Sequence, residues 1–96
     1  MNLVVRPVAA GEFEEISLWY DSQRRGLGDE FMDAAELALR SLTETPLIHR
    51  VVFRDLRRAK IRRFPYNIFY RVAGEDAIVV GCFHAKRDPR RWRRRR

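Results

Sequence analysis

The 96-residue sequence has little of what marks secreted, membrane or metal-binding proteins. Its single cysteine, Cys82, allows neither an intramolecular disulfide nor a thiolate metal cluster within one chain, and a reducing compartment fits that usage. No run of 18 apolar residues occurs, and the first residues lack the apolar stretch and cleavage motif of a signal peptide. Glycine-rich phosphate loops, paired carboxylates and zinc-ligand spacings are missing too, and His49 stands alone. We therefore expect a cytoplasmic protein with no metal, no cofactor and no membrane partner.

Lysine is scarce as well, since 18 of the 20 basic residues are arginine. The charge is unevenly divided: residues 1–48 hold 4 basic and 9 acidic side chains, net −5, whereas residues 49–96 hold 16 basic and 4 acidic, net +12. The planar guanidinium group binds phosphate in a bidentate manner and stacks on bases and aromatic rings. A nucleic acid, a nucleotide-binding enzyme or an acidic protein is thus the first partner to consider, although a genome rich in arginine codons would also produce this bias.

The length and the apolar periodicity predict one α+β domain. Residues 2–8 are rich in valine and are predicted to form a short strand, and residues 10–24 carry apolar side chains at helical spacing. Gly26 and Gly28 suit a helix end and a tight turn, and a second helix is predicted from Asp29 to about Thr43, before Pro46. Two helices joined by so short a loop should pack as an antiparallel hairpin with more apolar surface than one sheet face needs.

After Pro46 the pattern becomes alternating, which is typical of strands. Residues 58–63, 66–72 and 77–84 form the predicted antiparallel meander, with a hairpin turn at Gly74, and the last strand is expected to be buried on both faces. Residues 51–53 leave a further strand undecided. The predicted architecture is an N-terminal strand, an antiparallel helix hairpin and a mainly antiparallel twisted sheet (β-α-α-β-β-β), with one domain over residues 1–92 and a basic tail over 93–96.

Two groups of residues are candidates for function. Alternation places Arg58, Lys60 and Arg62 on one strand face at about 6.6 Å spacing, which suits a phosphate track, or else an ordinary solvated face. The neighbouring Tyr66 and Tyr70 are more consistent with packing residues whose hydroxyls reach the rim.

The second group lies near the end of the last predicted strand, where His84 is followed by Lys86 and Arg87. His84 with Arg87 and Arg63 could supply part of what metal-independent RNA cleavage needs, namely proton transfer and cations for the phosphate. The alternative is that His84 only orders the turn at Asp88. Cys82 is interpreted as a small core residue.

The run from Arg57 to Val72 and the run from Val79 to Trp92 strongly resemble the RelE/ParE superfamily of toxins. The helix with Trp19-Tyr20 and the turn Gly26-Leu27-Gly28 are similar to the same family, so the likeness spans almost the whole chain. The resemblance implies a growth-inhibiting toxin of a type II toxin–antitoxin pair, silenced by a cognate antitoxin.

The resemblance leaves the cellular target open. RelE-like members cut messenger RNA in the ribosomal A site with a Lys/Arg cluster and a C-terminal Tyr, whereas ParE-like members inhibit DNA gyrase and lack that cluster. This chain has Trp92 and no Tyr in its C-terminal segment, which favours the ParE-like side. A non-catalytic RNA-binding homologue is a third alternative.

The same resemblance, combined with the charge pattern, gives three sets of predicted site residues. The candidate catalytic residues are His84, Arg87 and Arg63. The residues expected to contact the target or a nucleic acid are Arg58, Lys60, Arg62, Lys86 and Trp92. The residues expected to contact the antitoxin are Phe13, Leu18, Trp19, Leu37 and Leu39. Besides the antitoxin, the expected partners are gyrase or the ribosome with its mRNA, and a homodimer or a hetero-oligomer with antitoxin is compatible with the sequence.

Overall fold

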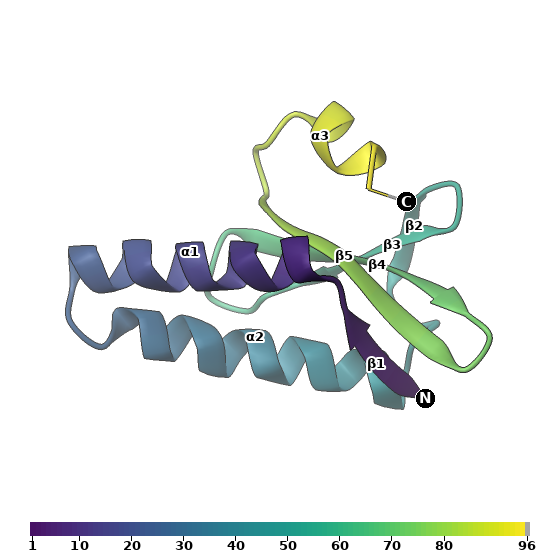
Figure 1. Ribbon diagram of the computed structural model, residues 1–96, viewed down its shortest axis with the longest axis horizontal. Coiled ribbons are helices and arrows are strands. Elements are labelled where there is room, and N and C mark those ends of the chain that lie inside the picture. The colour runs from purple at the N-terminus through teal and green to yellow at the C-terminus, as the bar shows by residue number, and fades with distance from the viewer. Residues whose placement is uncertain (96) are drawn as a thin grey trace.

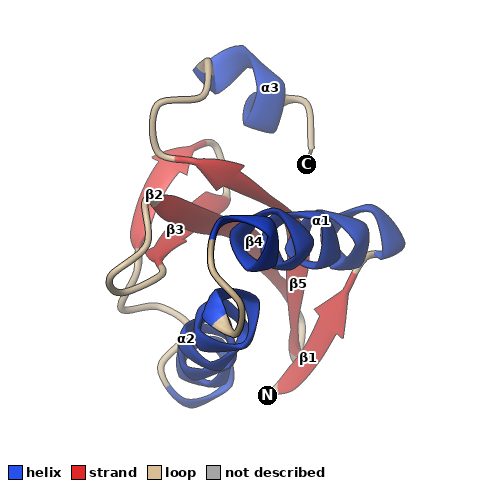
Figure 2. Ribbon diagram, turned by 90° about the vertical axis from the view of Figure 1, so that its left-hand side faces the viewer, coloured by secondary structure: helices blue, strands red, loops and turns tan. Residues whose placement is uncertain are grey.

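The computed structural model describes residues 1–95, which form one five-stranded sheet with helices on both faces (Figures 1 and 2). In chain order the elements are β1 (Asn2–Val5), α1 (Pro7–Gln23), α2 (Leu27–Glu44), β2 (Arg50–Phe53), β3 (Leu56–Lys60), β4 (Tyr66–Ala73), β5 (Asp76–His84) and α3 (Pro89–Arg93). In the described chain, no helix is long and apolar enough to cross a lipid bilayer.

The strand order is β1-β5-β4-β3-β2, with β1 parallel to β5 and all other neighbours antiparallel. The predicted α+β class and element order are confirmed. The undecided segment does form a strand, β2, so the meander has four strands instead of three. The first strand is shorter than expected, because α1 begins at Pro7, whose fixed φ and missing N–H suit the first turn of a helix.

The helix hairpin turns at Gly26, as predicted, where φ is +89°. Gly28 serves a second purpose, since its backbone lies directly against α1. A Cβ added at Gly28 would lie 2.3 Å from the carbonyl oxygen of Ser17 and 2.7 Å from the Asp21 carboxylate. The Asp21 Oδ1 atom accepts a hydrogen bond from the Gly28 N–H at 2.7 Å, which satisfies one of the free donors at the start of α2.

The sheet has a hydrophobic cluster on each face. Between the sheet and the helix hairpin, Phe13 of α1 and Phe31 of α2 pack on strand residues such as Tyr70 and Val79. On the opposite face Trp92 of α3 stacks on Phe69, with ring centroids 4.5 Å apart. The predicted packing role of Tyr70 is confirmed, and its hydroxyl donates a hydrogen bond to the Pro46 carbonyl.

The C-terminal segment is tied to the sheet where β1 ends. Strand β1 pairs with β5 only as far as Val79, so within the described residues the rest of β5 pairs with β4 on one side and has no strand on the other. The Glu12 carboxylate accepts hydrogen bonds from the Cys82 N–H at 3.1 Å and from both terminal nitrogens of Arg95 at 3.1 and 3.0 Å. Arg95 also donates to the Val80 carbonyl at 3.0 Å. The predicted tail boundary at residue 93 thus falls inside α3, and Arg96 lies outside the described residues.

Replacing Glu12 by Gln tests this contact. The amide keeps an acceptor for the Cys82 N–H but removes the negative charge facing Arg95, so we expect a loss of about 1 to 2 kcal/mol in the free energy of unfolding. Urea denaturation followed by circular dichroism measures it. Glu14→Gln, an exposed change in the same helix, is the control, and equal effects of the two variants would contradict the assigned role of Glu12.

Candidate functional site

A groove of about 590 Å³ lies between α2 and the sheet, next to the end of β3. We call it the hairpin groove. Its α2 side combines apolar and acidic side chains with one hydroxyl: Glu30, Asp33, Ala34, Leu37, Ala38 and Ser41. Its sheet side has three cationic residues, Lys60, Arg62 and Arg63, together with the imidazole of His49. Strand β2 pairs with β3 only as far as Arg58, so Ala59 and Lys60 have no neighbouring strand on that side within the described chain. The groove therefore borders an open sheet edge.

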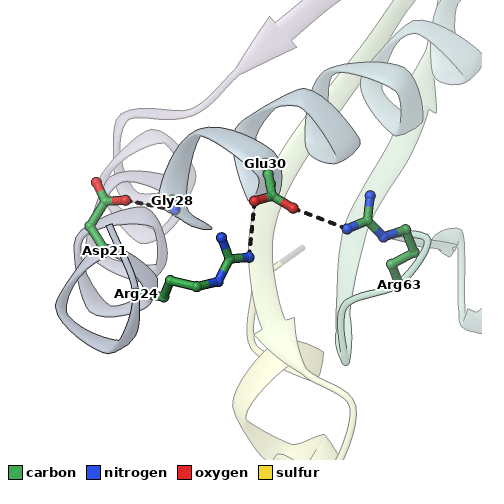
Figure 3. Close-up of polar contacts among 5 residues, drawn as sticks. All are labelled: Asp21, Arg24, Gly28, Glu30 and Arg63. Carbon is green, nitrogen blue, oxygen red and sulfur yellow. Dashed lines mark hydrogen bonds and ion pairs between the residues drawn. The ribbon is translucent and has the colours of Figure 1, made fainter. Parts of the chain in front are cut away.

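Glu30 fixes one end of the groove by joining the helix hairpin to the loop after β3 (Figure 3). Its two carboxylate oxygens bind Arg24 at 3.0 Å and Arg63 at 3.1 Å. The hydrogen bonds from Arg24 and then from Arg63 lower the pKa of the Glu30 carboxyl, so this clamp is ionised at neutral pH. Arg63 also has a positive φ of 72°, a backbone conformation that few residues other than glycine adopt. This conformation lies in the loop that the Arg63–Glu30 ion pair joins to α2.

The far end of the groove is built from residues that the sequence did not connect. The Oγ atom of Ser41 lies 2.9 Å from His49 Nε2, and the His49 ring packs edge-on against Tyr70. Arg57 donates to the carbonyl oxygens of His49 and Leu47. Burial, with a contribution from Arg57, lowers the pKa of His49, which keeps the imidazole neutral at physiological pH. No spacing motif links these positions, because they meet only once α2 packs on the sheet.

The surface of the helix hairpin carries exposed apolar side chains of the kind expected at an interface. Leu18 is 63% exposed, Trp19 is 55% exposed and Leu37 is 63% exposed. Two other predicted antitoxin contacts lie elsewhere. Phe13 is buried in the core against the sheet, because the apolar stripe of α1 faces inward at that position, and Leu39 packs partly against the same core.

The candidate catalytic residues do not form one cluster. His84 and Arg87 line a small pocket of about 150 Å³, whereas Arg63 lines the hairpin groove and is bound to Glu30. The small pocket also includes Glu12 and Glu15. The Lys86 N–H donates to His84 Nδ1 at 3.0 Å, which assigns the ring proton of a neutral His84 to Nε2. The pocket lining thus combines the Arg87 guanidinium with two carboxylates, one of which, that of Glu12, is already paired with Arg95.

Cys82 lies between the sheet and α1, as a core residue, in agreement with its interpretation from the sequence. Burial, and secondarily Glu12, raises the pKa of its thiol, so the reactive thiolate is not formed at neutral pH. Among the described residues, no three His, Cys, Asp or Glu side chains gather as metal ligands would.

The residues predicted to contact the target are divided as well. Lys60 and Arg62 line the hairpin groove, and Arg58 is exposed next to β2. The prediction that Trp92 contacts the target is wrong, because its ring is buried against Phe69 and is not available to a target. The alternation that suggested one phosphate track ends with β3 at Lys60, where the chain turns toward α2.

Comparison with known proteins identifies this architecture. The model of the family described as the ParE toxin of the type II toxin–antitoxin system parDE matches residues 3–89. The chain belongs to the ParE toxin family. It is therefore a toxin of the type II toxin–antitoxin class, on the ParE-like side of the RelE/ParE superfamily.

One similar solved structure is a chain of the chromosomal ParDE TA system from P. aeruginosa, with a TM-score of 0.79 and 15% sequence identity. The match covers 88% of the ParE-family chain described above and 95% of the P. aeruginosa chain, and at this identity it supports the fold. No curated protein sequence matches the chain.

Proposed function

We propose that this ParE-family protein inhibits DNA gyrase in the cytoplasm and is silenced by a cognate antitoxin seated on the hairpin groove. The observation that carries the proposal is the match to the ParE toxin family over residues 3–89. The separation of His84 and Arg87 from Arg63, which line two different pockets, supports a toxin that binds its target over one that cleaves RNA.

The hairpin groove suits an extended antitoxin segment. The free edge of β3 at Ala59 and Lys60 offers backbone groups that a further strand would pair with. Leu37, on the α2 side, offers apolar surface to alternate side chains of that strand, and Leu18 and Trp19 are further exposed apolar side chains, on α1. Lys60, Arg62 and Arg63 favour acidic groups in the segment. A disordered acidic peptide that folds on binding fits these features.

The alternative function is ribosome-dependent RNA cleavage, and the pocket containing His84 and Arg87 is the feature that favours it. If His84 transferred protons in that reaction, His84→Ala would lower the cleavage rate by about 100-fold or more. Toeprinting of translated mRNA, with wild-type and variant toxin side by side, measures this rate.

Purified gyrase and relaxed plasmid test the main proposal. We expect substoichiometric amounts of toxin, relative to plasmid base pairs, to block supercoiling, while the same amounts leave relaxation by a type I topoisomerase intact. The second enzyme is the control for simple coating of the DNA. An in vitro translation reaction receives the same toxin preparation. Codon-dependent mRNA cleavage with normal supercoiling would contradict gyrase inhibition and establish the alternative.

A further inference from the structure

A second cleft, separate from the hairpin groove, lies between the hairpin of β2 and β3 and the C-terminal helix α3. It has a volume of about 450 Å³, and Phe53, Arg54, Arg90, Arg93 and Arg94 line it. We call it the arginine cleft. Figure 1 shows that α3 and the β2–β3 end of the sheet lie on the side away from the helix hairpin. Four of its five lining residues are cationic, and none is acidic.

The arginines of this cleft are positioned by contacts with aromatic rings. The guanidinium carbon of Arg54 lies 5.3 Å from the Phe53 ring centroid, and that of Arg93 lies 5.1 Å from the same centroid. Arg93 also lies 5.6 Å from the Trp92 ring. Arg90 is oriented by Asp88, whose Oδ2 atom accepts hydrogen bonds from Nε of Arg90 at 3.0 Å and from Nη2 at 2.8 Å. Arg54 and Arg93 are thus held against Phe53 while remaining exposed to solvent.

The backbone at Arg54 has an unusual conformation. Its φ is +54°, in a two-residue turn between Phe53 and Leu56, and glycine adopts this conformation at a lower cost than other residues. An arginine in this conformation costs on the order of 1 kcal/mol relative to an unstrained residue. Four guanidinium groups around one cleft also repel one another. The tight turn accounts for the positive φ of Arg54, and Asp88 offsets part of the charge of Arg90, whereas an anion in the cleft would offset the remaining repulsion among the guanidinium groups.

We propose that the arginine cleft binds the phosphodiester backbone of a nucleic-acid strand. Guanidinium groups bind phosphate oxygens in pairs. Arg54, whose guanidinium packs on the Phe53 ring and is exposed to solvent, offers a planar surface on which an unpaired base could stack, which an acidic peptide would not use. The cleft would recognise the negative charge of the phosphates and the flat face of a base, whatever the base is. This binding needs no gyrase and so goes beyond the proposed function.

Fluorescence anisotropy tests the proposal with labelled 12-nucleotide single strands of DNA and RNA at 50 to 300 mM salt. The double variant R54Q/R93Q removes two charges from the cleft. We expect it to bind both strands about tenfold more weakly at low salt, and the slope of log K against log salt to fall in magnitude by about 1.4, or 0.7 for each lost phosphate contact. The control R25Q/R40Q removes two exposed charges from the helix hairpin and should change neither quantity appreciably.

Three results would overturn the proposal. The first is an absence of wild-type binding to both strands at 50 mM salt. The second is an equal loss in R25Q/R40Q, which would mean that net charge alone attracts nucleic acid. The third is competition by polyglutamate of the same charge as effectively as by unlabelled DNA, which would assign the cleft to an acidic protein. Circular dichroism melting of both variants establishes that they are folded. Because this assay contains no gyrase, an absence of nucleic-acid binding would not contradict the predicted inhibition of supercoiling. Equally, normal supercoiling in the gyrase assay would not contradict nucleic-acid binding by the arginine cleft.

Discussion

Gly28→Ala is expected to destabilise the protein by about 3 kcal/mol or more, while Gly11→Ala stabilises it by about 0.5 to 1 kcal/mol. The new Cβ at Gly28 would lie 2.3 Å from the Ser17 carbonyl oxygen, far inside contact distance, and the obstructing atom belongs to the α1 backbone. The helices would have to separate, and the hydrogen bond from the Gly28 N–H to Asp21 would weaken. At Gly11 nothing lies within 4 Å of the added carbon, so alanine only improves helix propensity.

Urea denaturation of both variants measures these opposite signs. Because each variant adds one methyl group to a helical glycine, helix propensity is matched and the difference reports the packing at the helix crossing. A Gly28→Ala protein as stable as Gly11→Ala would show that the hairpin tolerates a wider separation, and the close approach would lose its structural role.

The helix hairpin and the meander could be predicted from the sequence because both depend on local periodicity. Apolar spacing located the two helices, and Gly26 located the turn between them. The parallel pairing of β1 with β5 could not be predicted, since it joins residues about 74 positions apart through a crossover with no local signal. Strand β2 was left undecided because a four-residue edge strand carries too little pattern.

The candidate sites were less predictable than the fold. The exposure of Leu18, Trp19 and Leu37 could be predicted because they exceed what one buried helix stripe needs, and their contact with an antitoxin stays a prediction. Phe13 was misassigned to the surface, since composition alone does not say which side of the stripe meets the sheet. The arginine cleft was missed because Arg54 and Arg93 are 39 positions apart and meet only after α3 docks. Cationic residues of the C-terminal half are divided between the hairpin groove and this cleft, and the charge count along the sequence does not say how they separate in space.

The docking of α3 depends on Trp92, and Trp92→Ala is expected to cost about 3 to 4 kcal/mol of unfolding free energy. Trp92 is only 8% exposed and stacks on Phe69 with an interplanar angle of 18°. A five-residue helix has no stability of its own, so without this ring α3 should detach. Its release would expose Phe69, Leu56 and Phe83 to water. It would also draw Arg95 away from Glu12, which adds to the loss.

Trp19→Ala is the matched control, because it removes the same side chain from a site that is 55% exposed on the helix hairpin. We expect it to change stability by no more than about 0.5 kcal/mol, since its main ring contact is an exposed edge-on pair with Tyr20. With only two tryptophans in the chain, each variant also leaves a single tryptophan, whose emission can be excited apart from that of the three tyrosines. Trp92→Ala should emit at long wavelength from the solvated Trp19, and Trp19→Ala at short wavelength from the buried Trp92. Urea denaturation followed by circular dichroism gives the stabilities. Equal losses in the two variants, or a long-wavelength emission from Trp92, would contradict the docking of α3 on the sheet.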